Sequence, residues 1–241
     1  MRRLLVGLCW IVVPWYLLSL FVGSRVLPFP HAVAIRFATL VPEVLLPHAA
    51  ASLLRVLASL LVASAVAIPL GLAMGRIRAF DRVLAPAAYL LYPVPKIALL
   101  PILLLLLGTG DVSRVGLLAL VLVFQLLLAV RDGARDVDAH YLISLDSLGA
   151  TKVDHLRYCV WPLVLPRLLT AMRIGSATAL AVLFFAETFF TRYGLGYFIM
   201  DSWMKLSYLD MYAGIVAMSL LGFAMFAAID RVERRVGRWQ S

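Results

Sequence analysis

The sequence predicts an all-α fold: a polytopic helical membrane protein with about six transmembrane helices. Of its 241 residues, 63% are hydrophobic and 15% are charged, and the mean hydropathy is +0.98. Soluble domains are far less apolar, and a single membrane anchor would be much shorter. A spanning helix needs about 20 mostly apolar residues. Six stretches qualify: 4–22, 53–74, 84–107, 115–130, 168–190 and 212–229.

The first stretch is predicted to be a retained helix. Met1-Arg2-Arg3 precedes it as in a signal peptide, but the apolar run exceeds the usual signal core. Phe21-Val22-Gly23-Ser24 is also a poor cleavage site.

The distribution of positive charge predicts the orientation. Fifteen of the 22 basic residues fall on segments that share a side with the N-terminus, and six fall on the other side. Cytoplasmic loops carry the excess of Lys and Arg, so both termini are expected in the cytoplasm. The net charge of +9 then reflects topology and anionic lipid, with no case for nucleic acid. The terminal run Arg231, Glu233, Arg234, Arg235 and Arg238 is interpreted as a lipid anchor.

One long polar loop, 131–166, lies on the cytoplasmic side. Asp136 and Asp138 can cap a short helix that ends at Gly149, which can adopt the left-handed conformation. Thr151-x-x-Asp154 is a capping-box pattern, so a second helix is expected to start there and to end at Trp161-Pro162. The first helix is too short to be stable alone. Its apolar stripe, Tyr141, Leu145 and Leu148, therefore needs a partner surface, which is its own protein, lipid headgroups or another chain.

The loop resembles the cytoplasmic signature of permease subunits of binding-protein-dependent ABC importers, E-A-A-x3-G-x9-I-x-L-P. Gly149 and Pro162 match it, whereas Ile143-Ser144-Leu145 stand at the E-A-A positions. Further segments resemble the sulfonate, taurine and nitrate branch of that family: Gly71–Arg76, Tyr92–Pro101, Gly108–Gly110, Ala186-Glu187 and Gly194–Gly196. The resemblance covers about 50–235 as a five-helix core domain. An N-terminal helix with a periplasmic loop, 1–49, precedes it, and a tail, 236–241, follows.

The resemblance implies a type I ABC importer permease fold whose short cytoplasmic coupling helix docks on a separate ATPase. The residues implied at that contact are Tyr141, Ser144, Leu145, Asp146, Leu148, Gly149, Ala150 and Thr151. With Ile143 in place of the glutamate, docking is expected to be more apolar, or Asp146 supplies the acidic partner.

The same resemblance implies the assembly and its location. The expected assembly is a permease homodimer with two ATPase chains, which bind ATP and Mg, and a periplasmic or lipid-anchored solute-binding protein. The location implied is the bacterial inner membrane.

The sequence carries no sign of chemistry of its own. It has no phosphate-binding glycine loop, no metal-ligand cluster and no Ser/His/Asp arrangement, and its four histidines are scattered through loops. The protein is therefore expected to be a non-catalytic permease that needs no cofactor or metal of its own. The alternatives are a stand-alone carrier or channel, which usually shows internal repeats, and a membrane-embedded enzyme.

Five polar residues inside the apolar stretches are candidates for the translocation pathway, because polar groups in hydrocarbon tend to face protein or water. They are Lys96, Gln125, Ser176, Thr178 and Glu187. Each has a structural alternative. Lys96 follows Pro93 and Pro95, which bend a helix, and it can instead snorkel or pair with a freed carbonyl. Glu187 can pair with Arg192 or cap a re-entrant segment at Gly194 and Gly196. The other three can form interhelical hydrogen bonds.

Two further groups of residues predict surfaces. Gly71 with Gly75, and Gly175 with Ala179, have the spacing that allows close helix contact. Tyr193, Tyr197, Trp203 and Tyr208 are interpreted as an interfacial aromatic belt or as a contact for the solute-binding protein. The sequence does not identify the solute.

Overall fold

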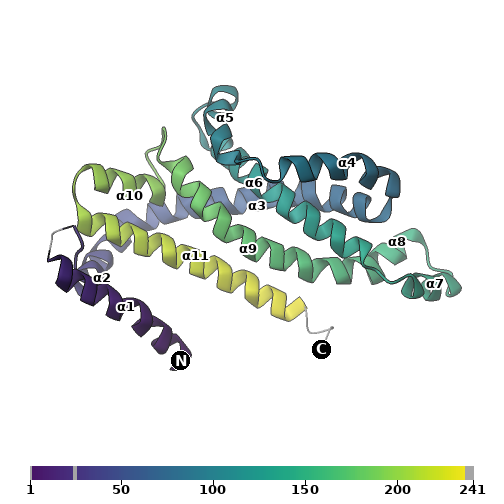
Figure 1. Ribbon diagram of the computed structural model, residues 1–241, viewed down its shortest axis with the longest axis horizontal. Helices are drawn as coiled ribbons and strands as arrows, with labels where there is room; N and C mark the ends of the chain where they lie inside the picture. Colours follow the sequence, from purple (N-terminus) through teal and green to yellow (C-terminus); the bar gives the residue numbers. More distant parts are fainter. Residues whose placement is uncertain (1, 24–25, 237–241) are drawn as a thin grey trace. The chain divides into compact units, whose positions relative to one another are not determined.

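The computed structural model describes residues 2–23 and 26–236, and every regular element in that part of the chain is helical (Figure 1). The α-helices are α1 (Arg2–Val22), α2 (Pro30–Leu40), α3 (Leu46–Arg76), α4 (Arg78–Leu91), α5 (Leu100–Leu107), α6 (Asp111–Arg135), α7 (Ala139–Ser147), α8 (Lys152–Asp154), α9 (Trp161–Glu187), α10 (Leu195–Met204) and α11 (Tyr208–Val236). Wider π turns occupy Val41–Leu45 and His155–Val160, and a 3₁₀ turn occupies Lys96–Leu99.

The chain divides into two compact units. The first comprises residues 1–53 and 187–221, and the second comprises 54–186 and 222–241. The core of the first unit is formed by Leu45, Leu195, Phe198 and Ala217. His48 extends this core, because its ring packs against the rings of Tyr197 and Phe198. Burial of these groups fixes the short helix α10 on the segment that leads into α3.

In the second unit, α6 has more buried residues than any other helix. Leu117, Leu118, Leu122, Leu126 and Val130 of this helix are all fully buried. From Leu118 onward they recur every four residues, a spacing that places side chains on one helix face. A helix with such a broad buried face is surrounded by protein, so α6 is the central element of this unit.

The predicted small-residue contacts are confirmed at three glycines. A Cβ on Gly71 would lie 2.8 Å from Leu127 O, and one on Gly75 would lie 2.6 Å from Ala134 Cβ. A Cβ on Gly175 would lie 2.8 Å from Leu122 Cδ2. The first two glycines let α3 approach α6, and the third lets α9 approach α6.

Among the described residues, four helices are long and apolar enough to span a membrane: Pro30–Arg76, Asp111–Arg135, Lys152–Glu187 and Tyr208–Val236. A fifth span is counted if Arg78–Leu91 and Lys96–Leu107 form one broken span, which bends by 87°. The bend lies at Pro93 and Pro95, as predicted. The first stretch forms α1, whose described apolar part, Cys9–Val22, is shorter than a full span.

The predicted helix end at Trp161-Pro162 is wrong. The helix that starts after Thr151 continues through Pro162 and Pro166 to Glu187 as one apolar helix. Proline normally clashes with the carbonyl one turn earlier. Here the π turn His155–Val160 precedes Pro162, and the wider turn accommodates the ring without ending the helix. The polar connection after α6 is therefore shorter than the predicted 131–166.

Candidate coupling site and translocation pathway

The predicted coupling helix is α7, and its start is capped as the sequence indicates. The Asp138 side chain accepts a hydrogen bond of 2.9 Å from the His140 backbone N–H. A short acceptor at this position satisfies one of the amides that a helix start leaves open. The cap fixes where α7 begins relative to the end of α6.

The end of α7 is a Schellman motif centred on Gly149. Gly149 has φ +76°, and its N–H donates to Asp146 O at 2.9 Å. The Ala150 N–H donates to Leu145 O at 3.1 Å. This pair of bonds requires a left-handed residue, which only glycine adopts without strain. The predicted role of Gly149 as a helix terminator is therefore confirmed.

The restart at Thr151 is the predicted capping box. The Thr151 N–H donates to Asp154 Oδ2 at 2.8 Å, and the Asp154 N–H donates to Thr151 Oγ1 at 3.3 Å. A contact of 3.0 Å between His155 Nε2 and Asp146 Oδ1 links the new helix to α7. These contacts join α7 and the start of the next helix into one angled unit, the coupling unit, residues 139–160.

The coupling unit exposes apolar side chains. Leu148 is 83% exposed, Val153 is 70% exposed and Tyr141 is 64% exposed, and Ile143 is also exposed. Leu145, the third residue of the predicted stripe, is half-buried. Neighbouring exposed apolar residues on a polar loop indicate a surface that another molecule covers. Asp146 keeps 63% of its side chain exposed although His155 Nε2 lies 3.0 Å from its Oδ1, so the apolar and the acidic docking mode both stay predictions.

Both ends of the coupling unit are tied to the core of the second structural unit. Arg167 on α9 donates to Asp136 Oδ2 at 2.6 Å at the end of α6. A Cβ on Gly133 of α6 would lie 3.3 Å from Val164 Cα on α9, so the two helices are in close contact there. A displacement of the coupling unit therefore acts directly on two packed candidate spans.

Lys96 lies in the 3₁₀ turn that follows the proline break. Its ammonium donates to the Tyr92 carbonyl and lies 5.0 Å from the centre of the Phe124 ring on α6. Tyr92 is the residue that caps the C-terminal end of α4, where the last carbonyls of a helix need partners outside it. The structure thus places Lys96 as its structural alternative describes, at a helix break, while also bringing it against α6.

Gln125 and Ser176 lie on the contact between α6 and α9. Gln125 Oε1 is buried without a hydrogen-bond partner among the described residues, and a Cβ on Gly175 would lie 2.9 Å from it. Ser176 is buried and donates to Arg173 O of its own helix at 2.7 Å. Thr178 is half-buried on α9. Of these three candidates, Gln125 has a polar atom that its surroundings leave available.

Glu187 is fully buried in the first structural unit and binds the start of α10. Its carboxylate accepts from Ser52 Oγ at 2.8 and 2.9 Å and from the Gly196 N–H at 2.8 Å. A Cβ on Gly194 would overlap this carboxylate, and Gly194 has φ +134°. Both constraints require glycine. The cap on the re-entrant segment is the arrangement that this geometry supports.

Two partners of this carboxylate cluster were not predicted. Ser52 Oγ also accepts the Leu195 N–H at 2.9 Å, and His48 Nδ1 lies 3.0 Å from the nitrogen and the oxygen of Gly194. Both residues lie on the apolar helix α3, about 140 positions away in the chain. Nothing local in the sequence distinguishes them from packing residues.

A second buried polar cluster was also missed. Arg55 donates to Asp111 Oδ1 at 2.9 Å, and Arg114 Nη1 donates to the carbonyls of Thr109 and Gly110 at 2.9 and 2.8 Å. Arg114 is 1% exposed. The sequence signal was present, because an arginine within an apolar stretch needs internal partners. In the count of basic residues used to predict the orientation, Arg55 and Arg114 were two of the six residues on the side opposite the N-terminus.

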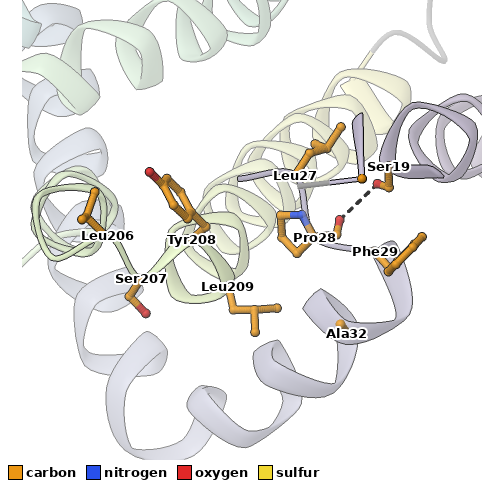
Figure 2. A pocket seen from close by; sticks show the side chains of 10 residues that line it. Ser19, Leu27, Pro28, Phe29, Ala32, Leu206, Ser207, Tyr208 and Leu209 are labelled. Carbon is orange, nitrogen blue, oxygen red and sulfur yellow. Dashed lines mark hydrogen bonds between the residues drawn. The ribbon is translucent and has the colours of Figure 1, made fainter. Parts of the chain in front are cut away.

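An apolar pocket of about 710 Å³ lies in the first structural unit between the end of α1 and the α10–α11 turn (Figure 2). Pro28, Phe29, Leu206, Tyr208 and Leu209 line it, and the Ser19 hydroxyl donates to Pro28 O at 3.3 Å. Leu206 has φ +57°, so the turn is tightly bent. Tyr208 of the predicted aromatic belt is part of this pocket.

Known proteins resemble this chain in both sequence and fold. The family described as "binding-protein-dependent transport system inner membrane component" matches residues 67–238. The taurine transport system permease protein of Escherichia coli is 30% identical over 80% of this chain and 70% of its own length. A putative aliphatic sulfonates transport permease of Bacillus subtilis is 26% identical over 91% of this chain and 80% of its own length.

The fold matches a solved transporter. The structure of an inward-facing MetNI methionine ABC transporter superposes with a TM-score of 0.66 at 20% identity, covering 78% of this chain and 94% of that one. The family match begins 17 residues after the predicted start of the core at 50 and covers the coupling unit, α9 and α11. Together with the apolar helices, these matches establish that the chain belongs to the inner membrane components of binding-protein-dependent transport systems, and it is a transmembrane permease subunit of an ABC importer.

Proposed function

We propose that this permease carries a small organic anion, of the class of taurine and other sulfonates, into the cell, and that a separate ATPase drives it. The taurine and sulfonate permeases that resemble the chain support this solute class. ATP and Mg would be bound by the ATPase, and the solute would be delivered by a binding protein. We place both termini in the cytoplasm of a bacterium, because the positive charge concentrates on that side.

The coupling unit carries this proposal. Its exposed apolar residues, Tyr141, Leu148 and Val153, form the surface on which the ATPase docks. The helix that begins in the unit is continuous with α9, and Arg167 ties it to α6. ATP-driven movement of the docked surface would therefore tilt α6 and α9 together, and this is a way to switch a permease between inward-open and outward-open states.

The solute path is proposed to run where α6 meets α9. Gln125 is the leading candidate, because its buried oxygen lacks a partner in the described residues. Ser176 and Thr178 lie on α9, whereas Lys96 lies against Phe124 of α6 and is held at the helix break by the Tyr92 carbonyl. Glu187 would act at a distance, by holding the re-entrant helix α10 in place.

The docking proposal is tested by placing a charge on the exposed surface. Leu148→Asp should greatly reduce the amount of ATPase that co-purifies with the permease, because docking would then bury a carboxylate in an apolar contact. Leu206→Asp is the matched control, since Leu206 is also exposed, at 69%, but lies in the α10–α11 turn. Membrane insertion should be normal for both variants. Equal ATPase recovery with wild-type protein and Leu148→Asp would contradict the assignment.

The solute class needs a separate test on the binding protein. The solute-binding protein that serves this permease should show a ligand-induced rise in melting temperature with taurine or an alkyl sulfonate, and none with an uncharged analogue. A shift with unrelated cations or sugars only would contradict the solute class and leave the docking result unaffected.

A further inference from the structure

We propose that this permease has a binding site for the phosphate of an anionic phospholipid at the ends of α3 and α6. A cavity of about 570 Å³ is lined there by Arg76, Arg78, Arg82 and Arg135, together with Met74, Gly75 and Asp81. These four arginines and the space between them are called the arginine cleft below. The site is independent of the proposed solute.

The arginine cleft has a large excess of positive charge. Its one acidic residue, Asp81, is already neutralised, because Arg131 binds it through two nitrogens at 2.5 and 3.0 Å. Arg131 is buried behind the cleft and is held also by Tyr89 Oη at 3.0 Å. In the described part of the chain, Arg76, Arg78 and Arg82 form no ion pair, and all three are exposed. Asp81 therefore supports the wall of the cleft, and of the four cleft arginines it pairs with Arg135 alone, at 3.7 Å.

Guanidinium groups suit a phosphate ligand. An arginine presents parallel N–H donors that match phosphate oxygens and is less strongly hydrated than a lysine. Arg76 Nη1 lies 3.5 Å from Ala134 O, so its guanidinium reaches the end of α6. Three neighbouring arginines without acidic partners repel one another, so binding an anion relieves that repulsion.

The position of the cleft favours a lipid over a free phosphate. α3 ends at Arg76 and α6 ends at Arg135, and both helices are candidate spans. Their ends meet where Gly75 packs on Ala134. The cleft therefore lies at the depth of the headgroups. Beside it, Val83 is 73% exposed, and Ile77 and Phe80 are about half exposed at 48% and 47%. These side chains provide apolar contact for the acyl chains that accompany a lipid phosphate.

Native mass spectrometry of the purified full-length permease with its ATPase tests the site. Phosphatidylglycerol should be retained in preference to phosphatidylcholine. The double variant Arg78→Gln and Arg82→Gln should weaken that retention about twentyfold, since each surface arginine contributes about a fivefold effect on an anionic lipid. Both side chains are exposed, so the variant should elute and melt like wild type. Lysine at both positions should keep an intermediate affinity, because charge remains and bidentate bonding is lost.

The matched control removes the same charge from another surface of the chain. Arg192→Gln with Lys205→Gln removes two exposed positive charges between α9 and α11 and should leave retention unchanged. An equal loss in both double variants would overturn the proposal in favour of general surface charge. Displacement of the lipid by millimolar inorganic phosphate, with no preference between the two lipids, would assign the cleft to a free anion. Loss of the ATPase from the cleft variant, with lipid retention intact, would assign it to a protein contact.

Discussion

The buried Glu187 shows how one residue holds two distant segments together. Its carboxylate accepts the Ser52 hydroxyl of α3, whose oxygen lies 2.8 and 2.9 Å from the two carboxylate oxygens, and the Gly196 N–H at the start of α10. In an apolar surrounding, a polar group that loses its partners costs free energy, so each member of this cluster depends on the others. The segment between α9 and α10 is therefore fixed by polar contacts as well as by packing.

Ser52→Ala should destabilise the permease by about 1 to 3 kcal/mol, because it removes the buried hydroxyl that binds both the Glu187 carboxylate and the Leu195 N–H. Thermal denaturation in detergent measures the effect. Ser64→Ala is the matched control, since Ser64 lies on the same helix and donates only to Leu60 O of its own turn, at 2.6 Å. Equal melting temperatures for the two variants would contradict a structural role of the cluster.

Lys96→Met should leave anion uptake close to wild type at matched expression and lower the melting temperature slightly. The side chain keeps its length, but Tyr92 O loses its donor at the helix break. Uptake in vesicles at limiting substrate, together with thermal denaturation, separates the two roles. A large loss of uptake with unchanged stability would place Lys96 in the solute path instead.

At the scale of elements, the molecule depends on glycines where helices end or touch. Gly149 ends α7 with φ +76°, and Gly75 brings α3 onto α6. A side chain is unfavourable at these two positions for different reasons. The first needs a backbone conformation that a side chain disfavours, and the second has no space for a Cβ.

Gly149→Val should misplace α7 while the spans insert normally, because a β-branched residue strongly disfavours the left-handed conformation. We expect the co-purified ATPase and uptake to fall several-fold, measured on the same membranes. Gly110→Val is the control, since Gly110 has φ −79° and a Cβ added there would meet no heavy atom within 4 Å. Full uptake by a well-expressed Gly149→Val protein would refute the lever assignment.

Gly75→Ala should destabilise the α3–α6 contact by about 1 to 3 kcal/mol, because its methyl would meet Ala134 Cβ and Arg131 O at 2.6 Å. Gly7→Ala in α1 adds the same methyl where no atom lies within 4 Å, and it should be neutral or slightly stabilising. Thermal denaturation compares the two. An unchanged melting temperature for Gly75→Ala would mean that α3 and α6 can move apart without a loss of stability.

At the scale of the whole molecule, one chain supplies one coupling unit. An importer driven by two ATP sites needs two such units, and a homodimer provides them by symmetry. Mass measurement of the solubilised complex should therefore give two copies of this chain with two ATPase chains. A complex with a single copy, or with a second and different permease, would contradict this stoichiometry.

Local sequence determined much of the secondary structure. The Asp138 cap, the Gly149 terminator and the Thr151 capping box follow from short-range backbone rules, and all three occur as predicted. The apolar stretches gave the candidate spans, because a spanning helix must satisfy its own backbone and cover itself with apolar side chains. Resemblance of scattered motifs gave the family.

Tertiary structure alone decided which polar residues meet. Ser52 and Glu187 are 135 positions apart, and Arg55 and Asp111 are 56 apart, and no periodic pattern pairs them. Proline rules predicted a helix end at Pro162, but the helix continues through the π turn before it, and α6 packs closely against it at Gly133 and Gly175. Packing between distant segments overrides a local rule when its stabilisation exceeds the local cost in free energy. The pattern within one segment of the sequence does not reveal that difference.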